Sequence, residues 1–141
     1  MFVSATWSGT IYTMDISKGP AGAAVATMKP SGSGYGAPER LGPPVNGAAP
    51  GMYPFIAPDE SYLVFSRMRP GEPVDQVLYV SFRTPDGNWG EPLPLDLGMR
   101  AGTPFVSPDG KYLFFSSGKR GENGDIYWIS AEILRPPAPV R

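Results

Sequence analysis

TPFVSPDGKYLFFSS, residues 103–117, repeats with few changes a phrase found earlier in the chain, YPFIAPDESYLVFSR at residues 53–67. The matched pairs share a constant offset of 50 residues: Pro54 and Pro104, Pro58 and Pro108, Asp59 and Asp109, Phe65 and Phe115. Self-similarity with a period near 50 is typical of repeat architectures. The phrase therefore predicts duplicated architecture rather than duplicated chemistry.

Shorter phrases extend the repeat on both sides. QVLYVS (76–81) matches DIYWIS (125–130), residue for residue, and YGAPERL (35–41) matches WGEPLPL (89–95) in the same way. At the N-terminus, MFVSA (1–5) and TIYTM (10–14) repeat the second and third phrases of the unit. We therefore expect a partial unit at the N-terminus that starts on a second strand.

Each unit reads as four short strands. TPFVS is the first, and SPDG is a tight turn whose Pro presets φ and whose Gly110 tolerates positive φ. KYLFFSS and DIYWIS follow as the second and third strands, separated by a polar loop. WGEPLPL is the fourth, and its prolines place it at a sheet edge because proline lacks a backbone donor.

The apolar runs choose among all-β folds. YLVF (62–65), YLFF (112–115) and IYWI (126–129) are apolar at every position, whereas a sandwich strand alternates apolar with polar. Four-stranded meanders buried on both faces match the blades of a β-propeller. No segment has the 3.6-residue period that the crossover helices of a parallel α/β fold would need.

The pattern resembles the WD-like β-propeller repeats with the signature P-x-x-SPDG-x-x-L-x-F-S-S followed by D-I-Y, over residues 1–16 and 35–134. Such repeats occur in the periplasmic propeller of the Tol–Pal system and in related bacterial envelope proteins, so the resemblance implies a periplasmic or extracellular location. The preceding unit departs from the signature at Ala57, Glu60, Arg67 and Gln76. The matching positions are Pro104, Ser107, Pro108, Asp109, Gly110, Leu113, Phe115, Ser116, Ser117, Asp125, Ile126 and Tyr127.

The predicted organisation is a partial propeller over residues 1–134 followed by a flexible tail at 135–141. It comprises a partial blade at 1–41, a blade at 53–97 and an incomplete blade at 103–134, about two and a half blades in all. We interpret the chain as part of a larger propeller; the alternative is a product that closes a ring by self-association.

Residues 17–34, SKGPAGAAVATMKPSGSG, interrupt the first unit. They are small, Gly-rich and weakly hydrophobic, so we expect a lengthened, mobile hairpin loop.

Composition excludes several classes of chemistry. The 141 residues include no His and no Cys, which removes His-based acid–base catalysis, Cys nucleophiles, disulfides and the usual zinc ligands. A formal net charge of −1 gives no electrostatic footprint for nucleic acid. No apolar run approaches the roughly 20 residues of a membrane span. Because MFVSATWSG has neither a basic n-region nor an apolar h-region, we expect no signal peptide in it.

Strand parity locates the expected binding surface. The 2–3 loops and the connections between units share one end of the blades, and loops on a rigid scaffold often carry binding residues. The candidate residues at this end are Arg67, Arg69, Arg100, Lys119, Arg120 and Asp125, with Asp75 and Glu122 nearby. The alternative is a solvated rim with local ion pairs, in which Asp125 caps its strand or pairs with Arg120.

No catalytic or metal site is predicted, and no cofactor is expected. GENGD (121–125) offers oxygen ligands for calcium but lacks the EF-hand spacing. The function we expect is a non-catalytic scaffold or binding segment for a protein or glycan of the cell envelope. The alternative is the accessory propeller portion of a hydrolase, peptidase or lyase.

Overall fold

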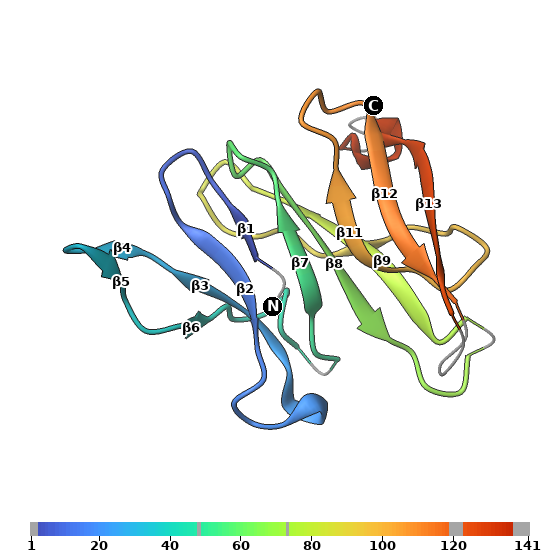
Figure 1. Cartoon of the computed structure of the whole chain (residues 1–141), viewed down its shortest axis with the longest axis horizontal. Coiled ribbons are helices and arrows are strands. Elements are labelled where there is room, and N and C mark those ends of the chain that lie inside the picture. Colours follow the sequence, from blue (N-terminus) through green and yellow to red (C-terminus); the bar gives the residue numbers. More distant parts are fainter. Residues whose placement is uncertain (1–2, 48, 73, 119–122, 137–141) are drawn as a thin grey trace.

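The structure is a computed structural model that describes residues 3–47, 49–72, 74–118 and 123–136. It is all-β, with 46% strand and 5% helix, and its strands form four antiparallel sheets. Three of the sheets succeed one another along the chain (Figure 1). The fourth is a two-stranded hairpin of β4 (Pro30–Ser31) and β5 (Gly34–Tyr35).

The three main sheets are meanders in which each strand pairs with the next one of its sheet. The first sheet holds β1 (Val3–Ala5), β2 (Ile11–Asp15), β3 (Ala24–Met28) and β6 (Glu39–Arg40). The second holds β7 (Met52–Ile56), β8 (Tyr62–Met68), β9 (Gln76–Phe82) and β10 (Leu93–Pro94). The third holds β11 (Gly102–Val106), β12 (Tyr112–Ser117) and β13 (Asp125–Ser130). Two 3-10 turns complete the elements, η1 (Pro20–Gly22) and η2 (Ala131–Leu134).

The four-strand prediction is confirmed in the second sheet. Its fourth strand, β10, lies at the edge and pairs only with β9, through Leu93 with Val80 and Pro94 with Tyr79. Pro94 thus occupies an edge strand and Pro92 lies just before it, at positions where a missing donor costs least.

The predicted layout of the first unit is wrong in two respects. The N-terminal strand β1 is the first strand of its sheet rather than a second strand, and β2 is the second. Residues 17–34, expected to be a loop, contain β3, whose residues Ala24, Val25 and Ala26 are buried. Alanines give weak strand signals in sequence, yet their small size lets β3 pack closely between its neighbours.

The third strands also need a correction of one residue. β8 pairs Phe65 with Tyr79, and β12 pairs Phe115 with Tyr127. The rings of each pair stack, with centroids 6.2 Å apart in the second sheet and 5.9 Å apart in the third. Tyr79 and Tyr127 are therefore equivalent, so the alignment of QVLYVS with DIYWIS is one residue out. A slip of one residue exchanges the two faces of a strand.

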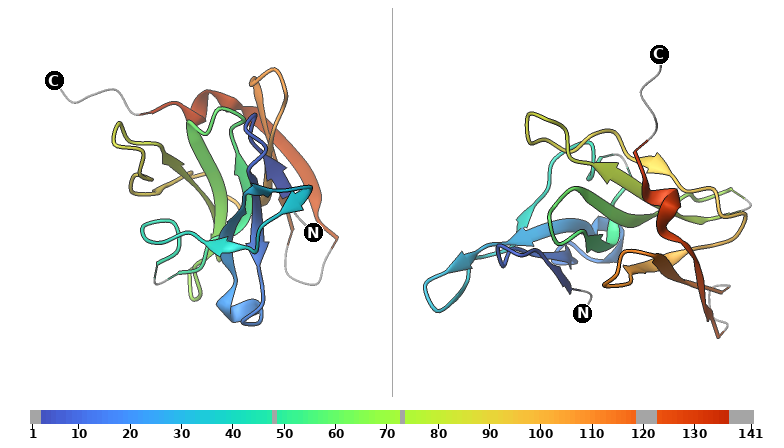
Figure 2. Two further views of the ribbon diagram at one scale, coloured as in Figure 1. Left: turned by 90° about the vertical axis from the view of Figure 1, so that its left-hand side faces the viewer. Right: turned by 90° about the horizontal axis from the view of Figure 1, so that it is seen from above.

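Two apolar clusters hold the three sheets together, and the views in Figure 2 show the sheets arranged side by side. The first cluster packs the first sheet on the second: Tyr12, Val25, Val45, Ile56, Leu63 and Phe65. The second packs the second sheet on the third: Phe55, Val64, Leu78, Val80, Leu95, Ala101, Val106, Leu113, Phe115, Ala131 and Leu134. The second sheet is thus buried on both faces, as its apolar strands predict.

No helix within the described ranges is long and apolar enough to cross a membrane.

Candidate binding groove and the predicted loop end

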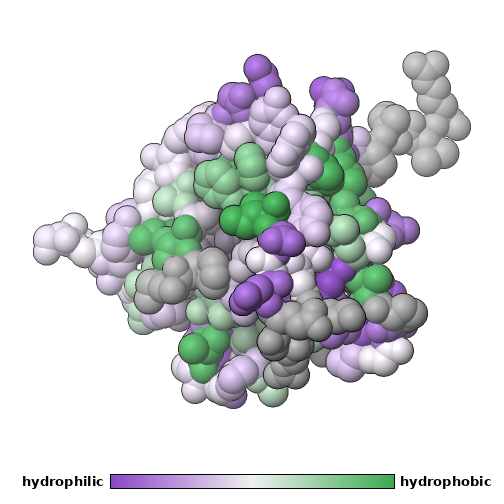
Figure 3. All heavy atoms as spheres, turned by 45° about the vertical axis from the view of Figure 1, so that its right-hand side comes forward, coloured by the Kyte–Doolittle hydropathy of each residue, from purple (hydrophilic) through white to green (hydrophobic). Residues whose placement is uncertain are grey.

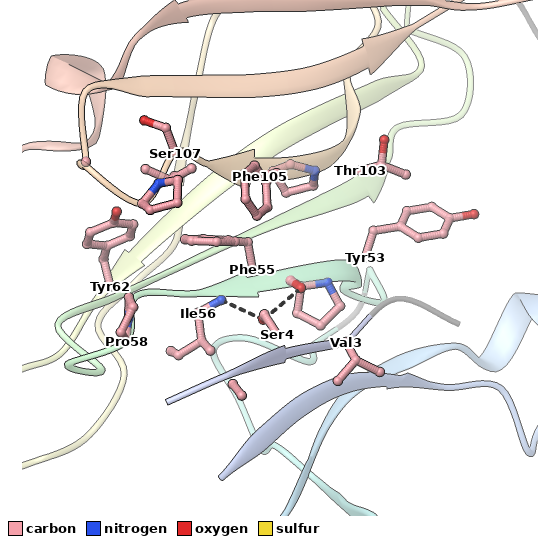
Figure 4. A pocket seen from close by; sticks show the side chains of 16 residues that line it. Val3, Ser4, Tyr53, Phe55, Ile56, Pro58, Tyr62, Thr103, Phe105 and Ser107 are labelled. Atoms are coloured by element: carbon pink, nitrogen blue, oxygen red, sulfur yellow. Dashed lines mark hydrogen bonds between the residues drawn. The ribbon is translucent and has the colours of Figure 1, made fainter. Parts of the chain in front are cut away.

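A groove of about 570 Å³ runs along the first strands of the three main sheets (Figure 4). It takes side chains from β1, β7 and β11, from the turns that follow β7 and β11, and from the start of β8. None of the described residues that line it is charged: Val3, Ser4, Ala5, Tyr53, Pro54, Phe55, Ile56, Pro58, Tyr62, Thr103, Pro104, Phe105, Val106, Ser107, Pro108 and Gly110. Its volume lies in the range of small-ligand sites.

Aromatic side chains form the floor of the groove. Phe55 and Phe105 meet edge to face, with ring centroids 5.7 Å apart. Phe55 is buried, whereas Phe105 is 52% exposed, so its ring offers an apolar contact to a ligand. Hydrophobic patches also appear among polar side chains on the face to which the third sheet contributes (Figure 3).

The backbone is strained at two equivalent positions of the groove. Tyr53 has φ 51° and Thr103 has φ 45°, each just before a proline and each within an irregular step of its strand pair. A β-branched residue with positive φ is an outlier, and such strain costs on the order of 1–3 kcal/mol. The repeat therefore keeps the strain on the strand that lines the groove.

One side chain joins β1 to β7. The Ser4 hydroxyl accepts a hydrogen bond from the Ile56 N–H at 2.9 Å and donates to the Pro54 carbonyl at 3.3 Å (Figure 4). The two strands belong to different sheets, so this hydroxyl replaces the partner that a strand ladder would supply.

Replacing Ser4 with alanine should lower the free energy of unfolding by about 1–2 kcal/mol, because the Ile56 amide loses its partner. Urea unfolding of the variant beside Ser4→Thr, which keeps a hydroxyl, measures the effect. A Ser4→Ala variant as stable as the parent chain would show that the bridge contributes nothing.

The side chain of Arg67, a predicted binding residue, is bound within the protein. Its Nη2 donates to the carbonyls of Pro44 and Val45 at 2.6 and 2.7 Å. The guanidinium also lies 5.1 Å from the ring centroids of both Phe65 and Tyr79. Burial lowers the pKa of Arg67. The residue thus fastens the connection between the first two sheets.

Arg100 ties the second sheet to the third. Its Nε donates to Asp75 Oδ1 at 2.8 Å, and its Nη1 donates to the Gly118 carbonyl at 3.1 Å. The backbone N–H of Arg69 bonds to the Asp75 carbonyl at 2.6 Å. Arg69 also lines a separate cavity of about 320 Å³ between this loop and the connection that carries Met99.

Of the remaining loop-end candidates, the structure describes Asp125. Asp125 is exposed at the start of β13, opposite Ser117. Lys119, Arg120 and Glu122 lie outside the described residues, as does part of the calcium candidate 121–125. A binding role for this end stays a prediction. In the described part of the chain, no group of three or more acidic side chains could hold a metal ion.

A polar cluster links the first and second sheets beside a cavity of about 500 Å³. Glu60 Oε1 accepts from the Tyr12 hydroxyl at 2.9 Å and from Arg83 Nη2 at 3.1 Å. The Arg83 guanidinium in turn stacks on Trp89, 3.9 Å from the ring centroid. The turn after β7 has Glu60, with φ 60°, at the position where the SPDG turn has Gly110, with φ 70°. The backbone of Glu60 is therefore strained, and its carboxylate lies in the cluster. The substitution of Glu for Gly was the sequence signal for this cluster.

The free energy of unfolding at alkaline pH should depend on this cluster. Burial, reinforced by the hydrogen bond to Glu60, raises the pKa of Tyr12 to about 12. The folded state therefore disfavours the phenolate. The contribution of Tyr12 to the free energy of unfolding is fully present below pH 10, and it is lost between pH 10 and 12 because the unfolded chain ionises first. An absorbance titration should show a tyrosine ionising near pH 12 that disappears in Tyr12→Phe. Unchanged titration curves would contradict the assignment.

No protein-family model matches the chain, and no curated protein matches it. The function is therefore argued from the geometry of the groove and the sheets.

Proposed function

We propose that this chain is a non-catalytic β-propeller segment that binds a protein or glycan partner of the bacterial cell envelope. The observation that carries the proposal is the shared groove: three successive meanders pack through apolar faces and bring their first strands together around it. In a β-propeller, four-stranded meanders are set around a central channel, and the shared groove supports the proposal because first strands would line such a channel.

The links between neighbouring sheets support this reading. Ser4 connects the first strands of the first and second sheets, while Arg100 connects the loop ends of the second and third. The two links differ in kind, and each holds one sheet against the next along the chain.

The outer face of the third sheet supports contact with further blades or with another copy of the chain. Strand register makes Ile126 equivalent to Leu78, and Trp128 equivalent to Val80. Leu78 and Val80 are buried in the cluster between the second and third sheets, whereas Ile126 is 78% and Trp128 61% exposed. Exposed apolar residues at positions buried in the preceding unit indicate an interaction surface.

A binding role is favoured over catalysis by the chemistry of the groove. Its described side chains are apolar, aromatic or hydroxylated, and among them is no acid or base that could transfer a proton at neutral pH. Such a surface suits recognition through shape, stacking and hydrogen bonds.

The experiment is a binding screen of the intact chain against immobilised peptides and oligosaccharides. Phe105→Asp places a charge in the groove at an exposed position, and Ile16→Asp is the matched control, since Ile16 is an exposed apolar residue outside the groove. We expect ligands whose binding is lost in Phe105→Asp and kept in Ile16→Asp. Equal binding by both variants, or no ligand at all, would contradict the proposal.

A further inference from the structure

The repeat leaves one hydrogen-bonding position of the groove occupied and its equivalent vacant. The occupied position is the pair formed by the Pro54 carbonyl and the Ile56 N–H, both bound by the Ser4 hydroxyl. At the offset of 50 residues the equivalent pair is the Pro104 carbonyl and the Val106 N–H. All four residues line the same groove.

The register shows that the second pair points the same way as the first. Ala57 N–H bonds to the Tyr62 carbonyl, and Ser107 N–H bonds to the Tyr112 carbonyl, both at 2.9 Å. In an antiparallel ladder the neighbouring pair is not hydrogen-bonded, so the N–H of the preceding residue points away from the partner strand. The Val106 N–H therefore projects from the free edge of β11, as the Ile56 N–H projects from β7.

The side chain that could fill the second position is apolar. The turns after β1 and β7 open with equivalent bonds, Thr6 N–H to Thr10 and Ala57 N–H to Tyr62. Two residues before these donors lie Ser4 and Phe55, which are thus equivalent.

Phe55 carries no polar atom and meets Phe105 instead of the backbone of β11. Among the described residues, no side chain hydrogen-bonds to the Pro104 carbonyl or the Val106 N–H. The strand β11 therefore presents an acceptor and a donor to the groove at the spacing that one hydroxyl bridges on β7.

We propose that the groove binds an extended, uncharged peptide segment whose serine or threonine hydroxyl bridges the Pro104 carbonyl and the Val106 N–H. The inference rests on the proposed function and names its partner. The strand β1 shows the binding mode, since Val3–Ser4–Ala5 is an extended segment that lies against β7 through its hydroxyl. The residues flanking the ligand hydroxyl contact Phe105 and the prolines of the groove, and the absence of charged lining residues selects a neutral segment.

The test is an NMR titration of the intact chain with acetyl-Val-Ser-Ala-amide, using acetyl-Val-Ala-Ala-amide as the probe that lacks the hydroxyl. We expect the serine peptide to shift the Val106 amide resonance and to bind roughly tenfold more tightly, since two hydrogen bonds are at stake. Equal affinities, or no shift at Val106 with either peptide, would overturn the proposal. So would a shift caused by chitotriose and not by the serine peptide, because a glycan would then be the ligand.

Variants at Phe55 provide a matched pair. Phe55→Ser and Phe55→Ala remove the same ring, but only serine places a hydroxyl at the Ser4-equivalent position. Phe55→Ser should therefore slow hydrogen exchange at the Val106 amide and abolish the preference for the serine peptide, while Phe55→Ala keeps that preference. Identical behaviour of the two variants would count against the equivalence.

Phe105→Ala serves if the Phe55 variants fail to fold, because Phe105 is exposed. It should weaken both peptides and preserve the preference for serine; loss of the preference would contradict a hydroxyl held by the backbone alone. Peptides that bind in the groove without regard to the hydroxyl would leave the proposed function standing and remove only this inference.

Discussion

Replacing Phe65 with alanine should lower the free energy of unfolding by about 3–5 kcal/mol, the range for a large aromatic side chain removed from a packed core. Phe65 is fully buried in the cluster between the first and second sheets. It also stacks on Tyr79 and lies beneath the Arg67 guanidinium, so its loss removes contacts on two sides.

Urea unfolding followed by tryptophan fluorescence measures this effect. Phe105→Ala is the control, since the same ring removed from a half-exposed position should cost far less. Equal losses in the two variants would mean that the first and second sheets do not pack through Phe65.

Replacing Asn46 with alanine should cost about 2–3 kcal/mol, because it leaves the buried Val25 N–H without a partner and removes two further hydrogen bonds. Asn46 lies in the connection between the first two sheets, where its side-chain amide bonds to the backbone of β3 as a neighbouring strand would. Its Oδ1 accepts from the Val25 N–H at 2.9 Å, and its Nδ2 donates to the carbonyls of Val25 and Leu41 at 2.7 and 2.8 Å. Val25 is fully buried, so water cannot readily replace the amide.

Asn46→Asp tests the assignment, since it keeps an acceptor for the Val25 N–H and loses both donors. Its free energy of unfolding should fall between those of the parent chain and Asn46→Ala. Two variants that match the parent within 0.5 kcal/mol, the usual range for surface positions, would contradict the role of Asn46.

The strands with strong local signals were predictable from sequence. TPFVSPDGKYLFFSS carries a turn with proline, aspartate and glycine between two apolar runs, and the structure places β11 and β12 on either side of that turn. The edge position of β10 also follows from its prolines.

The first unit was harder to predict because its strands lack such signals. The segment Ala24–Met28 contains small residues among glycines, and its strand structure depends on packing against β2 and β6 rather than on local preference. The one-residue error in the third strands has a different cause. Val, Leu, Ile, Tyr and Trp fill both faces of these strands, so composition alone leaves the register open.

The groove could not be predicted from its residues one by one. Turn signatures drew attention to the loop end, whereas the groove depends on three first strands, from different sheets, lying side by side. Arg67 and Arg100 appeared in sequence as free cations, and only the structure shows that they bond to backbone carbonyls. The equivalence of Ser4 with Phe55 was also hidden in the sequence, because residues 1–5 were matched with a second strand and only the hydrogen-bond register shows that β1 is a first strand.

The most direct test of the repeated groove is a comparison of hydrogen-exchange rates at the Ile56 and Val106 amides, measured by NMR on the intact chain. We expect slow exchange at Ile56, whose N–H bonds to Ser4, and much faster exchange at Val106, whose N–H has no such hydroxyl partner among the described residues. Equal rates at the two amides would contradict it: both slow would mean that Val106 already has a partner, and both fast would mean that β1 does not bind β7 through Ser4.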